Sequence, residues 1–216
     1  MKIAIIGATG FVGTSIRKEA VSRGHQVLAL TRSPHKITPS DVLAVKEIDV
    51  NDSEALAQTL AGNDVVVHAF APPRSDSVQE RIARQIRGTQ SIIKAVKQAG
   101  IERLVAVGGA GTAEVAPGVP LINSYFFPPE YEGGARSTAT IKDLLQAEKN
   151  IDWVFISPPN ILEAGVRTGK YRTGKDNLVI ELASGRSYMS VDDYALAMLD
   201  EIENPRHHRE RFTVGT

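Results

Sequence analysis

The sequence has no cysteine, no excess of either charge and no long apolar run, and each absence excludes a class of protein. Without cysteine there is neither a disulfide framework nor a thiolate metal site. Lysine and arginine together number 25, as do aspartate and glutamate, whereas proteins that bind nucleic acids or anionic membranes usually carry a basic excess. Nowhere do about 18 apolar residues follow one another, as a membrane-spanning helix requires.

The length of 216 residues suffices for one sizeable core but is short for two independent domains, so we expect a single domain over residues 1–216. The apolar run KIAII near the N-terminus is too short for the core of a signal peptide. The absence of cysteine is compatible with a reducing compartment. We therefore expect a soluble cytoplasmic protein, a monomer or homodimer, that acts on a small molecule and has no nucleic-acid, membrane or metal partner.

Short, nearly continuous apolar runs alternate with longer amphipathic segments along the chain. The runs are rich in Val, Ile and Leu, as parallel strands covered on both faces are, and they span residues 2–6, 25–30, 42–48, 64–70, 103–108 and 152–157. Strands that alternate with helices predict βαβ units. The fold class we expect is therefore α/β, a doubly wound parallel sheet with helices on both faces.

Several residues between these strands are of the types that begin or end helices. Gly24 can end the first helix, Ser53 can cap the second, and the third ends at Gly100. Ser190 and Asp193 have the spacing of a capping box before the last helix.

The alternation of strands and helices stops after Ser157. Residues 158–216 are too few for a separate domain, so we expect mostly a small cap on the substrate side of the sheet, with residues 211–215 as a last strand. Four basic residues in this part could bind a substrate phosphate or could belong to a solvated hairpin: Arg167, Lys170, Arg172 and Lys175.

Three glycines, Gly7, Gly10 and Gly13, form G-x-x-G-x-x-G between the first strand and the first helix. This turn needs glycine torsions, lets the backbone approach a pyrophosphate, and brings the helix close to the strand. The N-terminus of the helix then offers free N–H groups and a positive dipole to the phosphates. Glycines also mark ordinary turns, but the flanking strand and helix favour a dinucleotide site.

The second strand is followed by Arg32, where NAD-binding proteins of this fold often carry an acidic residue. A carboxylate there would repel the 2′-phosphate of NADP(H), whereas a guanidinium can bind it through paired hydrogen bonds, and Thr31 and Ser33 add hydroxyl donors. The residues therefore favour NADP(H), with NAD(H) possible, unless Arg32 is simply a solvated residue. Asp49, after the third strand, could accept a hydrogen bond from adenine or could lie beside a helix cap.

The chain resembles the atypical short-chain dehydrogenase/reductases nearly end to end, in the series GATGFVG, LTRSP, EIDVND, VVVHAFAPP, LVAVGGAG, DWVFISPP and SYMSVDDYALAMLDEIENPRHHRERFTVG. More narrowly, it resembles the NADH-flavin reductase group, similar to biliverdin reductase B and to NmrA-like proteins. The resemblance implies a Rossmann-like NAD(P)-binding domain. It leaves the reaction open, because the wider family includes epimerases, dehydratases, reductases and non-catalytic sensors.

The resemblance also implies roles for residues that match the family pattern. The pyrophosphate would be bound by the three glycines together with Thr9, Phe11 and Val12. The 2′-phosphate would be bound by Arg32 and Ser33. Adenine would be flanked by Asp49 and Val50. The nicotinamide ribose would be lined by Ala69, Phe70 and Ala71, and the nicotinamide ring by Gly108, Gly109 and Pro158.

The sequence departs from the family pattern at the catalytic residues. Tyr131 stands where members that oxidise alcohols carry the tyrosine of Y-x-x-x-K, but the fourth residue after it is Ala135 instead of lysine. Gly133 and Gly134 would weaken a helix start there, and the usual Ser or Thr after the fifth strand is replaced by GGAG, with Thr112 close behind. Tyr131 is thus either a catalytic acid or a half-exposed wall residue.

A missing acid–base triad favours hydride transfer to a flavin, because water can supply the proton. The adjacent glycines of GGAG could leave room for a flat ring or could form only a tight turn. The alternatives are an NAD(P)-dependent epimerase or dehydratase and an NmrA-like sensor that binds dinucleotide without turnover. The segment Tyr125, Phe126 and Phe127 could form a lid over the substrate or pack in the core.

Overall fold

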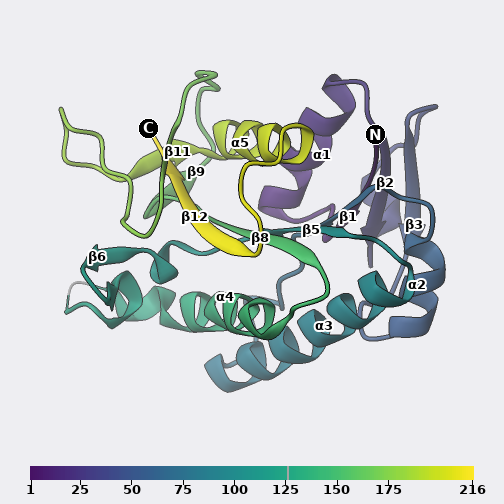
Figure 1. Ribbon diagram of the computed structural model, residues 1–216, viewed down its shortest axis with the longest axis horizontal. Coiled ribbons are helices and arrows are strands. Elements are labelled where there is room, and N and C mark those ends of the chain that lie inside the picture. Colours follow the sequence, from purple (N-terminus) through teal and green to yellow (C-terminus); the bar gives the residue numbers. More distant parts are fainter. Residues whose placement is uncertain (126) are drawn as a thin grey trace.

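An eight-stranded sheet forms the centre of the protein (Figure 1), described here by a computed structural model over residues 1–125 and 127–216. Its strands are β1 (Lys2–Ile6), β2 (Gln26–Thr31), β3 (Leu43–Glu47), β4 (Val65–His68), β5 (Arg103–Val107), β8 (Asp152–Ser157), β10 (Arg172–Gly174) and β12 (Glu210–Gly215). The strand order is β10-β12-β8-β5-β4-β1-β2-β3. Neighbouring strands are parallel except that β10 runs antiparallel to β12.

Helices cover both faces of this sheet. They are α1 (Phe11–Ser22), α2 (Ser53–Leu60), α3 (Val78–Gln98), α4 (Pro129–Ala147) and α5 (Val191–Glu203). Helices α1 and α5 pack together on one face, and α2, α3 and α4 lie side by side on the other (Figure 1). The predicted doubly wound α/β fold is confirmed.

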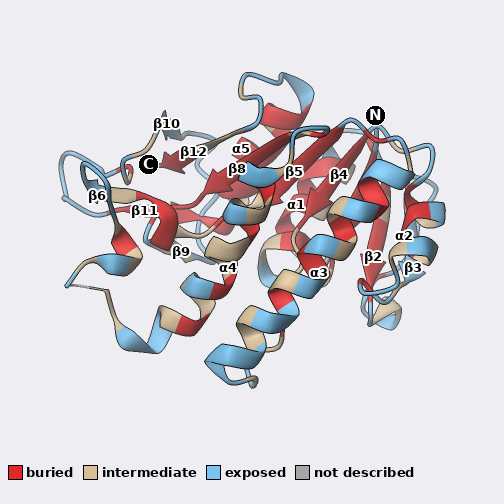
Figure 2. Ribbon diagram, turned by 60° about the horizontal axis from the view of Figure 1, so that its bottom comes forward, coloured by how far each residue is buried: buried red, intermediate tan, exposed pale blue. Residues whose placement is uncertain are grey.

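The inner parallel strands β1, β4, β5 and β8 are buried because each is apolar along nearly its whole length, whereas the edge strand β3 is mostly exposed (Figure 2). Ile3 and Ile5 of β1 face the core under α1 and α5, whereas Ala4 and Ile6 face the core under α2, α3 and α4. Alternate residues of one strand thus serve two separate hydrophobic cores. This explains why the sequence shows continuous apolar runs instead of an alternating pattern.

Short elements complete the chain around the carboxyl ends of the strands. They are the strand pairs β6 (Glu114–Ala116) with β7 (Val119–Pro120) and β9 (Ile161–Glu163) with β11 (Tyr188–Ser190), and 3₁₀ turns at Pro34–Lys36, Ala110–Thr112 and Leu121–Asn123.

The strand order reverses between β1 and β4, which are neighbours in the sheet although β2 and β3 separate them in sequence. From β1 the chain continues into α1 on one face, and from β4 into α3 on the other. Diverging connections of this kind leave a crevice outside the carboxyl ends of the strands, where ligands of open α/β sheets bind.

Two expected helix starts differ in the structure. The cap of α2 is Asp52, whose carboxylate accepts the N–H of Ala55, so Ser53 is the first helical residue instead of the cap. Helix α4 begins at Pro129 and includes Gly133 and Gly134, which the sequence led us to expect would weaken a helix there. At the last helix, Ser190 caps α5 as predicted and accepts the N–H of Asp193.

The C-terminal third was expected to form mostly a cap, but two of its strands belong to the central sheet. Strand β12 pairs with β8 and strand β10 with β12, so both extend the central sheet. The segment that lies on the predicted substrate side is the small β9–β11 sheet. Across the described residues, no helix is both long and apolar enough to cross a membrane.

Candidate dinucleotide and substrate site

The three glycines after β1 have different surroundings. Gly7 has φ +87°, and a Cβ there would overlap Ala69 O; a Cβ on Gly13 would overlap Gly7 O. Both glycines are therefore required for the tight strand–turn–helix packing itself. Gly10 has an extended backbone, and its Cβ would have one near neighbour, Gly7 O at 3.3 Å. A larger side chain on Gly10 would project into the adjoining cavity.

That cavity, of about 210 Å³, lies at the point where the strand order reverses. The residues lining it are Ile6, Gly7, Thr9, Gly10, Leu30, Thr31, Arg32, Ser33, Ile48, Val50, Ala69, Phe70 and Ala71. Most of the predicted cofactor residues are thus brought together. Phe11 is exposed and Val12 partly buried in the first turn of α1, beside the cavity residue Gly10.

The N-terminus of α1 carries no compensating side chain. No described side chain caps it, and its first turn contains no acidic residue. By contrast, Asp52 caps α2 and Ser77 caps α3, and each of those helices has a glutamate in its first turn. The free N–H groups of α1 therefore lie beside Gly10 with their positive potential unneutralised, as a phosphate-binding helix requires.

Thr31 ties the glycine turn to the end of β2. Its buried hydroxyl shares a 2.8 Å hydrogen bond with the hydroxyl of Thr9 and accepts the backbone N–H of Ser33 at 3.0 Å. The hydroxyl predicted to bind phosphate is therefore already used in holding the two loops in register.

Arg32 is exposed and lines both this cavity and a smaller one of about 90 Å³. In the part of the chain that the structure describes, no carboxylate lies within ion-pair distance of its guanidinium. The smaller cavity is also lined by Arg84 and Arg87 of α3 and by Asp49 and Val50. Three arginines and one carboxylate, that of Asp49, thus line the cavity beside the position predicted for a 2′-phosphate.

Asp49 is positioned by its own loop. Its carboxylate accepts both the backbone N–H and the side-chain amide of Asn51 at 2.9 Å, just before the cap residue Asp52. Asp49 thus lies beside a helix cap and also lines the smaller cavity, so its predicted contact with adenine stays a prediction. Val50 next to it is buried and lines both cavities.

A buried polar chain supports the loop after β4. His68 shares a 3.0 Å hydrogen bond with Thr89, whose hydroxyl accepts from the Gln85 amide, and that amide also donates to Phe70 O at 3.4 Å. Burial lowers the pKa of His68 from 6.5 to about 4, so the ring is neutral at pH 7. The ring of Phe70 packs on Gly88 of α3, where any Cβ would overlap it.

A larger cavity of about 690 Å³ lies between the end of β5, the first turns of α4 and strand β9. Its lining residues are Arg74, Arg81, Gly109, Ala110, Gly111, Phe127, Pro128, Glu130, Tyr131, Gly134, Ala135, Thr138, Asn160, Ile161, Leu162 and Glu163. Tyr131 is 65 % exposed and borders the cavity, and its role as a catalytic acid stays a prediction. Phe127 lines the cavity, Tyr125 is exposed, and Phe126 lies outside the described residues.

The glycines after β5 serve close packing. A Cβ on Gly108 would overlap Ile156 O, and one on Gly109 would lie 3.0 Å from Thr138 Cγ2 of α4. Gly108 is buried and donates to Ile156 O at 2.9 Å, and Pro158 is buried too. Neither lines the two cavities, so their predicted contact with nicotinamide stays a prediction.

The candidate hydroxyl after β5 is not available for proton transfer. Thr112 is buried, donates to Gly109 O at 2.8 Å and shares a 2.9 Å hydrogen bond with Ser157. The residue where a lysine would support Tyr131 is Ala135, and its Cβ lies against Gly111. Among the described residues that line the large cavity there is a tyrosine but no lysine, and the hydroxyl of the threonine there, Thr138, donates to Gly134 O at 2.9 Å.

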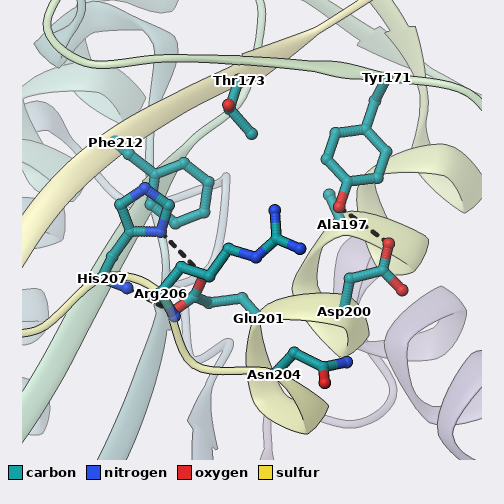
Figure 3. A pocket seen from close by; sticks show the side chains of 9 residues that line it. All are labelled: Tyr171, Thr173, Ala197, Asp200, Glu201, Asn204, Arg206, His207 and Phe212. Carbon is teal, nitrogen blue, oxygen red and sulfur yellow. Dashed lines mark hydrogen bonds and ion pairs between the residues drawn. The ribbon is translucent and has the colours of Figure 1, made fainter.

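A further cavity, of about 300 Å³, lies at the far end of α5 (Figure 3). Its polar groups bond to one another: the hydroxyl of Tyr171 donates to Asp200 at 2.8 Å, and His207 contacts Glu201 at 2.8 Å while stacking on Phe212. His207 thus makes structural contacts within the protein.

The family model for NAD(P)H-binding proteins matches residues 7–205. The chain belongs to this family. YwnB of Bacillus subtilis (strain 168) is 42% identical over 99% of this chain and 98% of its own length. A Bacteroides thetaiotaomicron structure named a "putative epimerase" has a TM-score of 0.90 and 42% identity, covering 99% of this chain and 96% of that one. A "putative NADH-flavin reductase" from Streptococcus pneumoniae TIGR4 has a TM-score of 0.87 and 30% identity, covering 100% and 99%.

Membership of this family confirms the predicted atypical short-chain dehydrogenase/reductase resemblance and the NAD(P)H-binding oxidoreductase class. The geometry fits such a cofactor: Gly10 lines the cavity, and within the described part of the chain no side chain caps α1 and no carboxylate lies within ion-pair distance of Arg32. When bound, NAD(P)H would supply a hydride.

Sequence reasoning missed the arginines at the mouth of the site. Arg74 and Arg81 line the large cavity and Arg84 and Arg87 the small one. Three of them, Arg81, Arg84 and Arg87, follow one another at a spacing of three residues in the first half of α3, and this spacing was the available signal. The basic residues named instead do not line either cavity: Arg167 pairs with Glu19, and Arg172 bonds to backbone carbonyls.

Proposed function

We propose that the protein is an NADPH-dependent reductase of flavins or of similar flat conjugated acceptors. The observation that carries the proposal is the large cavity beside the dinucleotide site, which has no lysine-supported tyrosine and no free hydroxyl after β5. Such a site can orient an acceptor but lacks the tyrosine–lysine pair that transfers a proton in members that oxidise alcohols. An oxidised isoalloxazine suits it, because the ring takes up one hydride and can receive the accompanying proton from water.

The residues of the chain would then act by binding and positioning. Gly10 and the start of α1 would hold the diphosphate, and Arg32 would bind the 2′-phosphate and so select NADPH. The Phe70 loop, braced by Gln85, would hold the ribose next to the end of β5. Bringing two flat rings into contact can account for most of the acceleration of a hydride transfer that needs no enzyme acid.

Steady-state oxidation of NADPH, followed by its absorbance, tests the proposal. The wild type should consume NADPH only when FMN or riboflavin is added, and the loss should be faster than in the flavin-plus-NADPH mixture without protein. Binding of NADPH with no flavin-dependent consumption would instead support a dinucleotide sensor.

An epimerase is the second candidate, favoured by the name of the 42% identical Bacteroides structure. Such an enzyme would remove and return a hydride on the same substrate, so it would consume no NADPH over a full cycle. It would also need a tyrosine supported by a lysine, whereas the fourth residue after Tyr131 is Ala135, which lies against Gly111. Net NADPH consumption with an added acceptor therefore separates the two functions.

A further inference from the structure

Arg81 projects from the first turn of α3 to the wall of the large cavity, where it lies against α4. A Cβ on Gly134 would lie 3.1 Å from one terminal nitrogen of its guanidinium, and a Cβ on Gly133 would lie 3.0 Å from Val78 Cγ2. The two glycines inside α4 thus let the guanidinium sit between the helices. Glycine destabilises a helix relative to alanine, so their presence here has a packing reason.

The guanidinium of Arg81 has no counterion. Among the described residues, no carboxylate lies within ion-pair distance of it, and its buried Nε has no hydrogen-bond partner. The arginines around it are paired: Arg84 with Asp76 at 3.1 Å, and Arg136 with Glu132 at 2.6 Å. A partly buried cation without a partner is unfavourable, and an anion that entered the cavity would relieve that cost.

A second cation borders the same cavity. Arg74 is exposed and follows the Phe70 loop, so it lies on the side that joins the dinucleotide site. Glu130 and Glu163 also line the cavity, but neither reaches ion-pair distance of Arg81. Two arginines beside one opening suit a group with two negative charges, which a guanidinium binds through two parallel hydrogen bonds.

We propose that Arg81, assisted by Arg74, binds a phosphate monoester on the acceptor, so that the cavity selects FMN over riboflavin. This inference rests on the proposed flavin reduction for its substrate but concerns a specificity-determining contact. The cavity volume of about 690 Å³ is in the range of pockets that enclose a ligand of this size. FMN and riboflavin differ by the phosphate alone, so comparing them isolates the contact with Arg81.

The test compares Arg81→Gln with wild type for both flavins, using flavin fluorescence for binding and NADPH oxidation for kcat/KM. Loss of a charge-assisted pair should reduce the FMN-to-riboflavin ratio in both measurements by roughly 10- to 100-fold. The matched control is Arg136→Gln, an exposed residue of α4 that does not line the cavity and should leave the ratio as in wild type.

Gly134→Ala is a second variant, which tests the position of the Arg81 guanidinium while Arg81 itself is kept. Its Cβ would push the guanidinium by a few tenths of an ångström, so the FMN-to-riboflavin ratio should fall slightly while thermal stability is kept or raised, because alanine favours the helix. An equal loss for both flavins would show that Arg81 only supports the fold.

The outcomes also separate this inference from the proposed function. Reduction of both flavins with no preference, in wild type and Arg81→Gln alike, would overturn the inference and keep the function. Arg81-dependent preference for FMN in binding without any NADPH oxidation would keep the inference and overturn the function. If neither flavin binds, both fail.

Discussion

The carbonyl oxygen of Gly7 lies where a side chain on Gly13 would have to be. This contact joins the end of β1 to α1 and leaves Gly10, between them, facing the cavity. Two glycines of one motif therefore hold the fold together, while the third leaves space for a ligand. The two roles can be separated by substitution.

Gly10→Val should abolish dinucleotide binding while the protein stays folded, because its backbone is extended and its side chain would fill phosphate space. Gly13→Ala should instead lower the free energy of unfolding by at least ~1–3 kcal/mol, because the clash is with backbone. Calorimetry with NADPH and thermal unfolding measure the two effects. Normal NADPH binding by Gly10→Val would place the pyrophosphate elsewhere.

Arg32→Ala should weaken NADPH binding by roughly 10- to 150-fold, the equivalent of a charge-assisted hydrogen-bond pair. NADH has no 2′-phosphate and should bind almost as before, and the loss for NADPH should shrink at high salt because the arginine is exposed. Lys36→Ala, an exposed neighbour that does not line the cavity, is the matched control. Equal losses for both cofactors would assign Arg32 to the fold or to the shared diphosphate.

Tyr131→Phe should change the rate of flavin reduction by no more than a few fold. The hydroxyl is exposed on the cavity wall and Ala135 replaces the lysine that would support it as an acid. Loss of a general acid typically costs about 10²-fold or more. A drop of that size in kcat would make Tyr131 a proton donor and favour a dehydrogenase or epimerase.

His68 should make the protein less stable as the pH falls from 6.5 toward 4. Burial lowers its folded-state pKa to about 4, so in this window the unfolded chain binds a proton that the folded protein does not. The contribution is about 1.4 kcal/mol per pH unit. In chemical denaturation between pH 7 and pH 5, His68→Gln should lose stability less steeply than wild type. If the free energy of unfolding fell equally steeply with pH in both proteins, His68 would be protonated inside the fold.

The sequence was sufficient to predict the parallel strands and the dinucleotide turn, because both depend on local patterns. Continuous apolar runs require burial on two faces, and Gly7, Gly10 and Gly13 stand in a spacing with a physical reason. Arg32 follows directly from the end of β2. These features need no knowledge of distant contacts.

What the sequence did not reveal depends on contacts between segments far apart in the chain. Gly133 and Gly134 were interpreted as weakening a helix, but their reason is the approach of Arg81 and Val78, some fifty residues earlier. Thr31 was expected to bind phosphate, but Thr9 and Ser33 already use its hydroxyl. Local propensity cannot indicate which side chain will fill a space on another element.

The central claim is that hydride passes from NADPH to a flavin held in the large cavity. Anaerobic mixing of wild-type protein with limiting NADPH and excess FMN tests it most directly, since oxygen cannot then regenerate the flavin. We predict one FMN reduced for each NADPH consumed, much faster than without protein, and no acceleration by Gly10→Val. NADPH that stays unoxidised while bound to the wild type, with the flavin still oxidised, would contradict the claim.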